Sequence, residues 1–171
     1  MTFFKTAFFL TFVVRSASTY AESSLPDFSQ FPVSKEEMLK GKPAPIKLSS
    51  YEGAKTYKTK LKEGAKEGPN FAGHYTIVSF GCGTQCQDNW LIDAKTGQIL
   101  NRFSSTVGIK QQIDSALLII NPPDANLKKA YEEHPDQPLL GEMETIYKVL
   151  KNGKLKVVHK DKWVNVIKSL P

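Results

Sequence analysis

The sequence predicts a mainly β protein of the α+β class: a single domain with a mostly antiparallel sheet of about seven strands, built from hairpins, and two or three short helices. Runs of β-branched and aromatic residues are separated by short turns that contain glycine, which is typical of hairpins. No alternation of strand and helix of the kind that builds a parallel sheet occurs. The length of 171 residues, 40% of them hydrophobic, suits one domain with a substantial core.

Residues 1–21 predict a secretory signal peptide. Lys5 gives the start a positive charge, residues 7–14 are apolar, and the small residues Thr19 and Ala21 precede the expected cut. A charged start, a short apolar run and a site of small residues are the three parts of such a leader. The apolar run is shorter than the roughly 20 residues that span a bilayer, so we expect no transmembrane segment after cleavage. A buried N-terminal helix is the alternative interpretation.

The charge of the chain is basic, with 23 Lys+Arg against 17 Asp+Glu. After removal of residues 1–21, Arg102 would be the only arginine in the sequence, so the other basic residues are all lysine. Proteins that recognise nucleic-acid bases, or that bind a phosphate through two parallel hydrogen bonds, usually do so with arginine side chains. We therefore expect no nucleic-acid partner, and an unidentified protein or envelope ligand instead.

Residues 22–47 form an expected extended lead-in, because prolines recur there and apolar residues do not cluster. A short helix is predicted within it over residues 34–41. Ser34 suits the N-cap, Glu37 the third helical position, and Gly41 the C-terminal end.

Residues 48–171 form the expected globular domain. Within the lysine-rich stretch 51–68, residues 57–62 alternate in polarity and predict a half-exposed strand. Residues 71–80 are rich in β-branched and aromatic side chains, which predicts the first buried strand.

The C-terminal part of the sequence predicts hairpins separated by one short helix. Asp124 suits the cap of a helix that continues to residue 134. Asn152 and Gly153 are the strongest short-range hairpin signal in the chain. Residues 163–167 close the chain as a strand or a short helix. The expected strands cover residues 89–93, 98–103, 115–120, 145–150 and 154–160.

Cys82 and Cys86 are the only cysteines, and export would bring them into an oxidising compartment. We therefore expect them to form a disulfide. A closed ring of about five residues contributes only about 2 kcal/mol, so the bridge would shape a loop more than hold the fold. A zinc site that includes His74 and a cysteine nucleophile with His74 as base are alternatives. The first lacks a fourth ligand, and the disulfide would exclude the second.

The loop around the cysteines is the candidate binding site, and no cofactor or metal site is predicted. His74 is interpreted first as a structural residue that bonds a nearby loop, and second as a general base or ligand contact. Asp88 and Asp93 are its possible acid partners, although Asp93 precedes a turn whose backbone it is expected to bond. The candidate binding residues are His74, Tyr75, Gly81, Gly83, Thr84, Gln85 and Asp88.

Three motifs carry a resemblance to an uncharacterised family of small exported proteins of Gram-negative bacteria. They are N-F-A-G-H-Y at residues 70–75, G-C-G-T-x-C at residues 81–86, and D-x-x-T-G at residues 93–97. A further D-S pair at residues 114–115 fits the pattern, whereas Ala116 departs from it where the family has arginine. The resemblance implies export to the periplasm or secretion, and it implies no activity.

Together these observations predict an exported binding or accessory protein without enzymatic activity that uses a disulfide-stapled loop. A structural component of the envelope is one alternative. A small hydrolase that uses His74 with Asp88 or Asp93 is the other.

Overall fold

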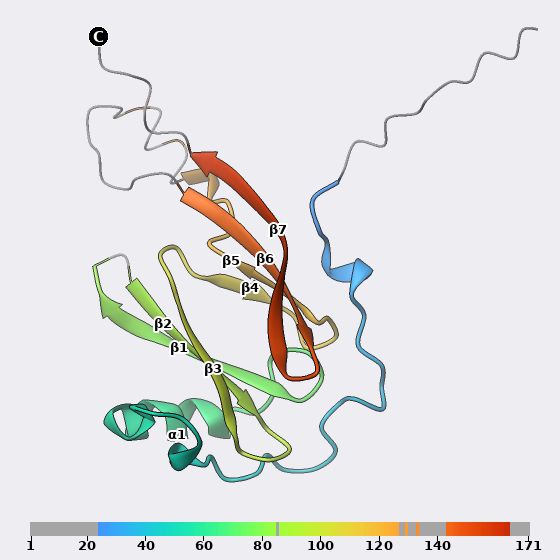
Figure 1. The fold of residues 1–171 in the computed structure, drawn as a ribbon, viewed down its shortest axis with the longest axis vertical. Helices are drawn as coiled ribbons and strands as arrows, with labels where there is room; N and C mark the ends of the chain where they lie inside the picture. Colours follow the sequence, from blue (N-terminus) through green and yellow to red (C-terminus); the bar gives the residue numbers. More distant parts are fainter. Residues whose placement is uncertain (1–23, 85, 127–128, 130–132, 134–142, 165–171) are drawn as a thin grey trace, which may run out of the picture.

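The computed structural model describes residues 24–84, 86–126, 129, 133 and 143–164, and the strands there form two antiparallel sheets (Figure 1). The first sheet has the order β1-β2-β3, and the second has the order β4-β5-β6-β7. The mainly β, antiparallel prediction of about seven strands is confirmed, but the prediction of one sheet is wrong. The strands are β1 Tyr75–Gly83, β2 Cys86–Asp93, β3 Ile99–Ser105, β4 Ile109–Gln111, β5 Leu117–Ile120, β6 Met143–Lys151 and β7 Lys154–Val164.

The predicted hairpins are present, with strands close to the expected limits. β2 pairs with β3 across the Asp93–Gln98 turn, and β6 pairs with β7 across Asn152 and Gly153. Asn152 has φ 52° and Gly153 has φ 69°, which is the left-handed conformation that an Asn-Gly hairpin turn requires. The helix predicted from Asp124 lies largely outside the described residues, as do residues 165–167.

The strand predicted over residues 57–62 is wrong, because this segment begins the α-helix α1 (Lys58–Lys66). Lysine, leucine, glutamate and alanine all favour helix. Tyr57, Leu61 and Ala65 recur every four residues, and all three pack against the same core. The helical spacing therefore buries more apolar surface than the alternation would. α1 is the only α-helix with bounds in the described residues, and three short 3-10 helices precede it: η1 Phe28–Gln30, η2 Leu48–Ser50 and η3 Ala54–Tyr57.

The short helix predicted over residues 34–41 is also wrong, because only one turn forms there. The backbone N–H of Ser34 donates to Glu37 Oε2 at 3.0 Å, and the N–H of Glu37 donates to Ser34 O at 3.1 Å. The backbone bond from Ser34 is the main reason that the pKa of Glu37 lies below its usual value. The chain then leaves the helical path because the N–H of Leu39 donates to Gly73 O at 3.0 Å. Tertiary pairing thus overrides a valid cap signal.

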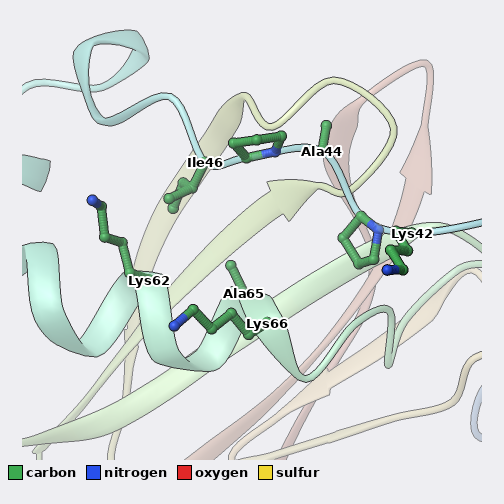
Figure 2. Close-up of a pocket in the computed structure, with 8 residues that line it drawn as sticks. Lys42, Ala44, Ile46, Lys62, Ala65 and Lys66 are labelled. Atoms are coloured by element: carbon green, nitrogen blue, oxygen red, sulfur yellow. The ribbon is translucent and has the colours of Figure 1, made fainter.

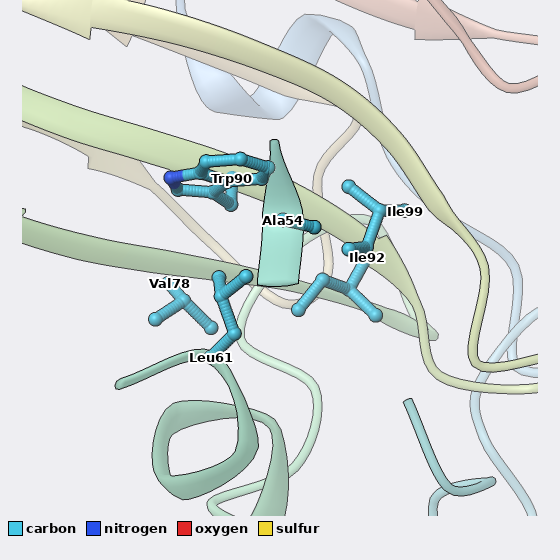
Figure 3. Packing of buried hydrophobic residues seen from close by; sticks show 6 residues of the cluster. All are labelled: Ala54, Leu61, Val78, Trp90, Ile92 and Ile99. Atoms are coloured by element: carbon cyan, nitrogen blue, oxygen red, sulfur yellow. The ribbon is translucent and has the colours of Figure 1, made fainter. Parts of the chain in front are cut away.

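The described residues form three layers, with the first sheet between α1 and the second sheet (Figure 1). Trp90 and Ile92 of β2 face α1 and its neighbours (Figure 3). Leu91, between them in the sequence, faces Leu118 and the other residues of the second core. All three β2 side chains are at most 2% exposed. β2 is therefore the central strand of the protein.

The lead-in lies across both sheets and joins them. Its first part pairs with the residues just before β5, where the N–H of Val33 donates to Asp114 O at 2.8 Å. Its second part follows the β2–β3 turn, where the N–H of Lys47 donates to Gly97 O at 2.7 Å. Gly97 has φ 73°, and a Cβ there would meet the carbonyl oxygen of Pro45. Only glycine lets the lead-in approach this turn so closely.

We predict that Gly64→Ala destabilises the protein, although the same change in an open helix is favourable by about 1 kcal/mol. A Cβ at Gly64 would lie 2.5 Å from Val78 Cγ1 and 3.2 Å from Val78 Cβ. The resulting overpacking is expected to lower the free energy of unfolding by about 1–3 kcal/mol, measured by urea denaturation. Thr59→Ala, on the exposed side of α1, is the matched control. Val78→Ala in the same chain should recover part of the loss, and strict additivity of the two changes would contradict the predicted contact.

Candidate functional site

The β1–β2 hairpin ends in a tip closed by the predicted disulfide between Cys82 and Cys86, whose Cα atoms lie 5.2 Å apart. Gly81 pairs with Gln87, and Gly83 pairs with Cys86, so a bulge leaves Cys82 outside the regular ladder. Gly83 has φ 143°, a conformation that residues with a side chain rarely adopt. The disulfide prediction is confirmed, and the flanking glycines explain how so short a ring closes.

The tip is exposed. Gly81, Cys82, Gly83 and Thr84 are all exposed to solvent, and the hairpin end lies at the periphery of the molecule (Figure 1). Gln85, which the sequence also assigned to the binding loop, lies outside the described residues. The structure thus brings together the glycines, Thr84 and the disulfide as one surface, called here the stapled tip.

The stapled tip continues into an open edge of the first sheet, because β1 is an edge strand. At Ile77 this edge is covered by the side chain of Asn70, which donates to Ile77 O at 3.0 Å and accepts from Ile77 N at 2.8 Å. Alternate residues of an antiparallel strand direct their backbone groups to the same side, so those of Ser79 and Gly81 point to the same edge as those of Ile77. Among the described residues, no backbone bond outside the sheet reaches these two positions.

His74 and Tyr75 lie at the opposite end of β1 from the stapled tip, so the expectation that they flank it is wrong. Tyr75 pairs with Asp93, whereas Gly83 pairs with Cys86. The eight steps between Tyr75 and Gly83 correspond to roughly 26 Å of extended strand. These two groups of candidate residues therefore do not form one binding site.

His74 serves a structural contact, which was the first of its two interpretations. Its Nδ1 lies 2.7 Å from the backbone oxygen of Glu37, and because a carbonyl only accepts, Nδ1 donates. Its Nε2 lies 4.0 Å from Asp93 Oδ1. The His74 ring also lies against the ring of Tyr75, with 4.1 Å between centroids. His74 therefore fixes the lead-in against the start of β1.

Asp93 bonds the β2–β3 turn, as the sequence predicts. Its Oδ1 accepts from the N–H of Lys95 at 2.8 Å, and its Oδ2 accepts from the hydroxyl of Thr96 at 2.8 Å. Burial, with the negative charges of Asp93 and Glu37, raises the pKa of Tyr75. His74 and Asp93 are neighbours, but turn and lead-in contacts occupy both carboxylate oxygens and one ring nitrogen.

Asp88 is not part of an exposed loop and is not a partner of His74, which corrects both expectations for it. The residue is 1% exposed. Its Oδ2 accepts from Trp90 Nε1 at 3.0 Å, and the Arg102 guanidinium binds both oxygens, with Nε 2.8 Å from Oδ1 and Nη2 2.9 Å from Oδ2. This fork keeps the buried carboxylate paired. The bond to Asp88 is also the main reason that the pKa of Arg102 is raised.

The Arg102 guanidinium also covers aromatic rings. Its central carbon lies 4.8 Å from the Trp90 ring centroid and 5.2 Å from that of Tyr57. Sequence reasoning missed this cluster because it depends on the β2–β3 register, in which Trp90 pairs with Arg102. The available signal was the spacing of Asp88 and Trp90, which places both side chains on one face of a strand.

A further candidate surface, which the sequence did not predict, is a groove between α1 and residues 42–46 (Figure 2). This groove has a volume of about 640 Å³. Ala65, Ile46 and the two neighbouring prolines form its apolar lining, and the side chains of Lys42, Lys62 and Lys66 complete it. The groove was not foreseen because no helix was predicted over residues 58–66, where one of its walls lies.

Comparison of the chain with protein-family models, with curated proteins and with solved structures finds no match. Over the described residues, no helix has the length and apolar character needed to cross a membrane. The same residues contain no group of three or more His, Cys, Asp or Glu side chains placed to hold a metal ion. The stapled tip, the open edge and the groove are the features of the described residues that bear on function.

We predict that Arg102→Ala is among the most destabilising changes in the first sheet, because it leaves the buried Asp88 carboxylate without its counter-ion. Loss of the partner of a buried polar group typically lowers the free energy of unfolding by about 1–3 kcal/mol, and water can replace part of the lost contact because the Arg102 side chain is 38% exposed. Urea denaturation of Arg102→Ala, Asp88→Asn and the double variant measures the coupling, with exposed Lys110→Ala as the control. The double variant should be more stable than Arg102→Ala alone. A coupling energy near zero would contradict the ion pair.

Proposed function

We propose that this chain is an exported, non-enzymatic binding or accessory protein that docks a protein partner at the stapled tip. The observation that carries the proposal is the continuity of two features: a tip closed by the Cys82–Cys86 disulfide and the open edge at Ser79 and Gly81. A bridged tip is already ordered before a partner arrives, so little conformational entropy is lost on docking.

The partner is expected to add a short extended segment to β1. Proteins usually protect an edge strand with charged side chains, proline or a covering segment. The section of β1 from Ser79 to Gly83 contains neither charge nor proline, whereas the earlier section is covered by Asn70 at Ile77. Glycines at positions 81 and 83 let another backbone approach closely. Main-chain bonds to the edge would supply affinity, and contacts with Thr84 would supply selectivity.

Export is part of the same proposal. It is supported by the leader pattern of residues 1–21 and by the disulfide, since such bonds persist in oxidising compartments. The location is the periplasm of a Gram-negative bacterium or the medium outside the cell. If the protein were only a structural component of the envelope, it would have no need for an exposed tip beside an uncovered strand edge. A hydrolase would require His74 and Asp93 to be available for chemistry, whereas both are bonded to the lead-in and the turn.

Export predicts a specific mass for the protein recovered from a Gram-negative host. The intact chain should lack residues 1–21, because a signal peptidase removes the leader after Ala21. Cys82 and Cys86 should react with iodoacetamide only after reduction, and intact mass spectrometry before and after reduction measures both results. An uncut chain, or two thiols alkylated without reductant, would contradict export and the oxidised state of the tip.

Docking at the stapled tip predicts position-dependent crosslinking. p-Benzoylphenylalanine placed at Thr84 should give one main adduct in the exporting host after irradiation. The same group at exposed Lys156, on the second sheet, is the matched control and should give none. The adduct should weaken when both cysteines are changed to serine, because the free loop loses more entropy on docking.

Ser79→Pro tests strand addition separately. It removes an N–H on the free edge without removing a β1–β2 ladder bond, which is where proline is tolerated in a sheet. It also removes the bond that the Ser79 hydroxyl donates to Asn89 Oδ1 at 2.7 Å, so Ser79→Ala, which loses this bond and keeps the N–H, is the matched control. The adduct at position 84 should decrease while circular dichroism stays unchanged. An adduct of equal yield at positions 84 and 156, or no adduct at position 84, would overturn the proposed docking.

A further inference from the structure

We propose that the groove between α1 and residues 42–46 binds an anionic amphiphile with a single alkyl chain, such as a fatty acid. The alkyl chain would lie on the apolar lining and the carboxylate would lie beside Lys62 and Lys66, with Lys42 on the opposite wall. This site shares no residue with the stapled tip, so the proposal goes beyond the proposed function. It stands on the size, lining and charge of the groove.

The size and construction of the groove suit a small molecule. Its volume of about 640 Å³ falls inside the range of roughly 300–1,000 Å³ for small-molecule sites. One wall is the last part of α1, and the other is the extended lead-in (Figure 2). Both walls are anchored, because Leu61 of α1 is fully buried and the lead-in bonds to the β2–β3 turn at Ala94 and Gly97. The groove is therefore largely formed before a ligand arrives.

The lining favours an alkyl chain over a polar molecule. Residues 43–46 are Pro, Ala, Pro and Ile, and Ala65 faces them from the helix (Figure 2). Pro43 and Pro45 have no backbone N–H, and the N–H of Ala44 donates to Ala94 O at 2.8 Å. Residues 43–45 of the lead-in therefore offer no free backbone donor to a sugar or a nucleobase. Ile46 and Ala65 also pack against the first core, so the floor continues the apolar interior.

The charge around the lining selects an anion. Lys62 and Lys66 are four residues apart on α1 and lie on the same side of the helix, while Lys42 lies on the opposite wall (Figure 2). Within the described part of the chain, none of these three ammonium groups forms an ion pair. Like charges four residues apart repel each other on a helix. An anionic head group beside Lys62 and Lys66 would relieve this repulsion, and the lysine stems would extend the apolar lining.

The test uses the exported chain and sodium decanoate as the probe, with binding measured by titration calorimetry and located by backbone amide NMR shifts. Decanoate should bind at one site and shift the amides of Ala44, Ile46 and Ala65. Acetate has the carboxylate without the chain, and decyl maltoside has the chain without the charge. Both should bind at least about tenfold more weakly, because each lacks one of the two contributions. Equal binding of either control would overturn the proposal.

Charge reversal tests the lysines directly. Lys62→Glu with Lys66→Glu should weaken decanoate binding by about tenfold, and Lys42→Glu on the other wall by about threefold. The matched control is Lys154→Glu with Lys156→Glu on the exposed side of β7 in the other sheet, which makes the same change of net charge away from the groove and should alter affinity less than about twofold. Thermal unfolding confirms that each variant is folded. Equal losses in the groove and control variants would show non-specific attraction and overturn the proposal.

Two further probes distinguish the amphiphile from a larger anionic partner. Phosphatidylglycerol vesicles present an anionic surface, and a hexaglutamate peptide presents carboxylates without an alkyl chain. Binding of either probe without binding of decanoate would replace the proposed ligand with a membrane surface or an acidic protein. Decanoate binding that survives at moderate salt and is lost in the groove variants would support the proposal, because an apolar contribution is not screened.

Discussion

Burial of both faces of β2 organises the described structure. Trp90 and Ile92 need an apolar layer on one side of the sheet, and Leu91 needs another on the opposite side. A single helix cannot cover both faces, so α1 covers one and the second sheet covers the other. Each fully buried side chain of this size contributes about 1.5–3 kcal/mol to the free energy of unfolding. The surrounding elements are therefore held in place largely by their contacts with β2. The lead-in follows from the same constraint, because it closes the margins of both layers by bonding to Asp114 and Gly97.

The buried face of β2 also accounts for the ion pair at its start. Asp88 lies two residues before Trp90 and shares its face, so the carboxylate is removed from water together with the indole. An unpaired charge in this place would be costly, and the Arg102 fork with the Trp90 N–H removes that cost. The pair lies two residues from Cys86, at the base of the stapled tip. A short disulfide contributes little stability by itself. The tip is held mainly because the strand below it is fixed by packing and by this ion pair.

Local signals predicted the features that depend on neighbouring residues. The Asn152–Gly153 hairpin, the β2–β3 hairpin, the Cys82–Cys86 bridge and the bonding of Asp93 to its turn all follow from residues a few positions apart. Features that depend on distant partners were missed. Tyr57 to Lys62 satisfies a period of two as well as a helical repeat, and only the position of the core decides between them. The division into two sheets, the Asp88–Arg102 pair and the distance between His74 and the stapled tip all require the register of strands, which composition does not encode.

Both proposed surfaces depend on how α1 meets β1. Gly64 faces Val78 so closely that no methyl group fits between them without movement. Ala65, the next residue on α1, lines the groove, and Ser79, the next residue on β1, begins the open edge. This tight contact therefore fixes how closely α1, one wall of the groove, lies on β1, whose following residues form the free edge. Because a packed contact of this kind resists continuous adjustment, the groove and the edge are both preformed surfaces. Preformation is the property that a binding protein of modest size needs, since ordering either surface at the moment of binding would consume much of the available affinity.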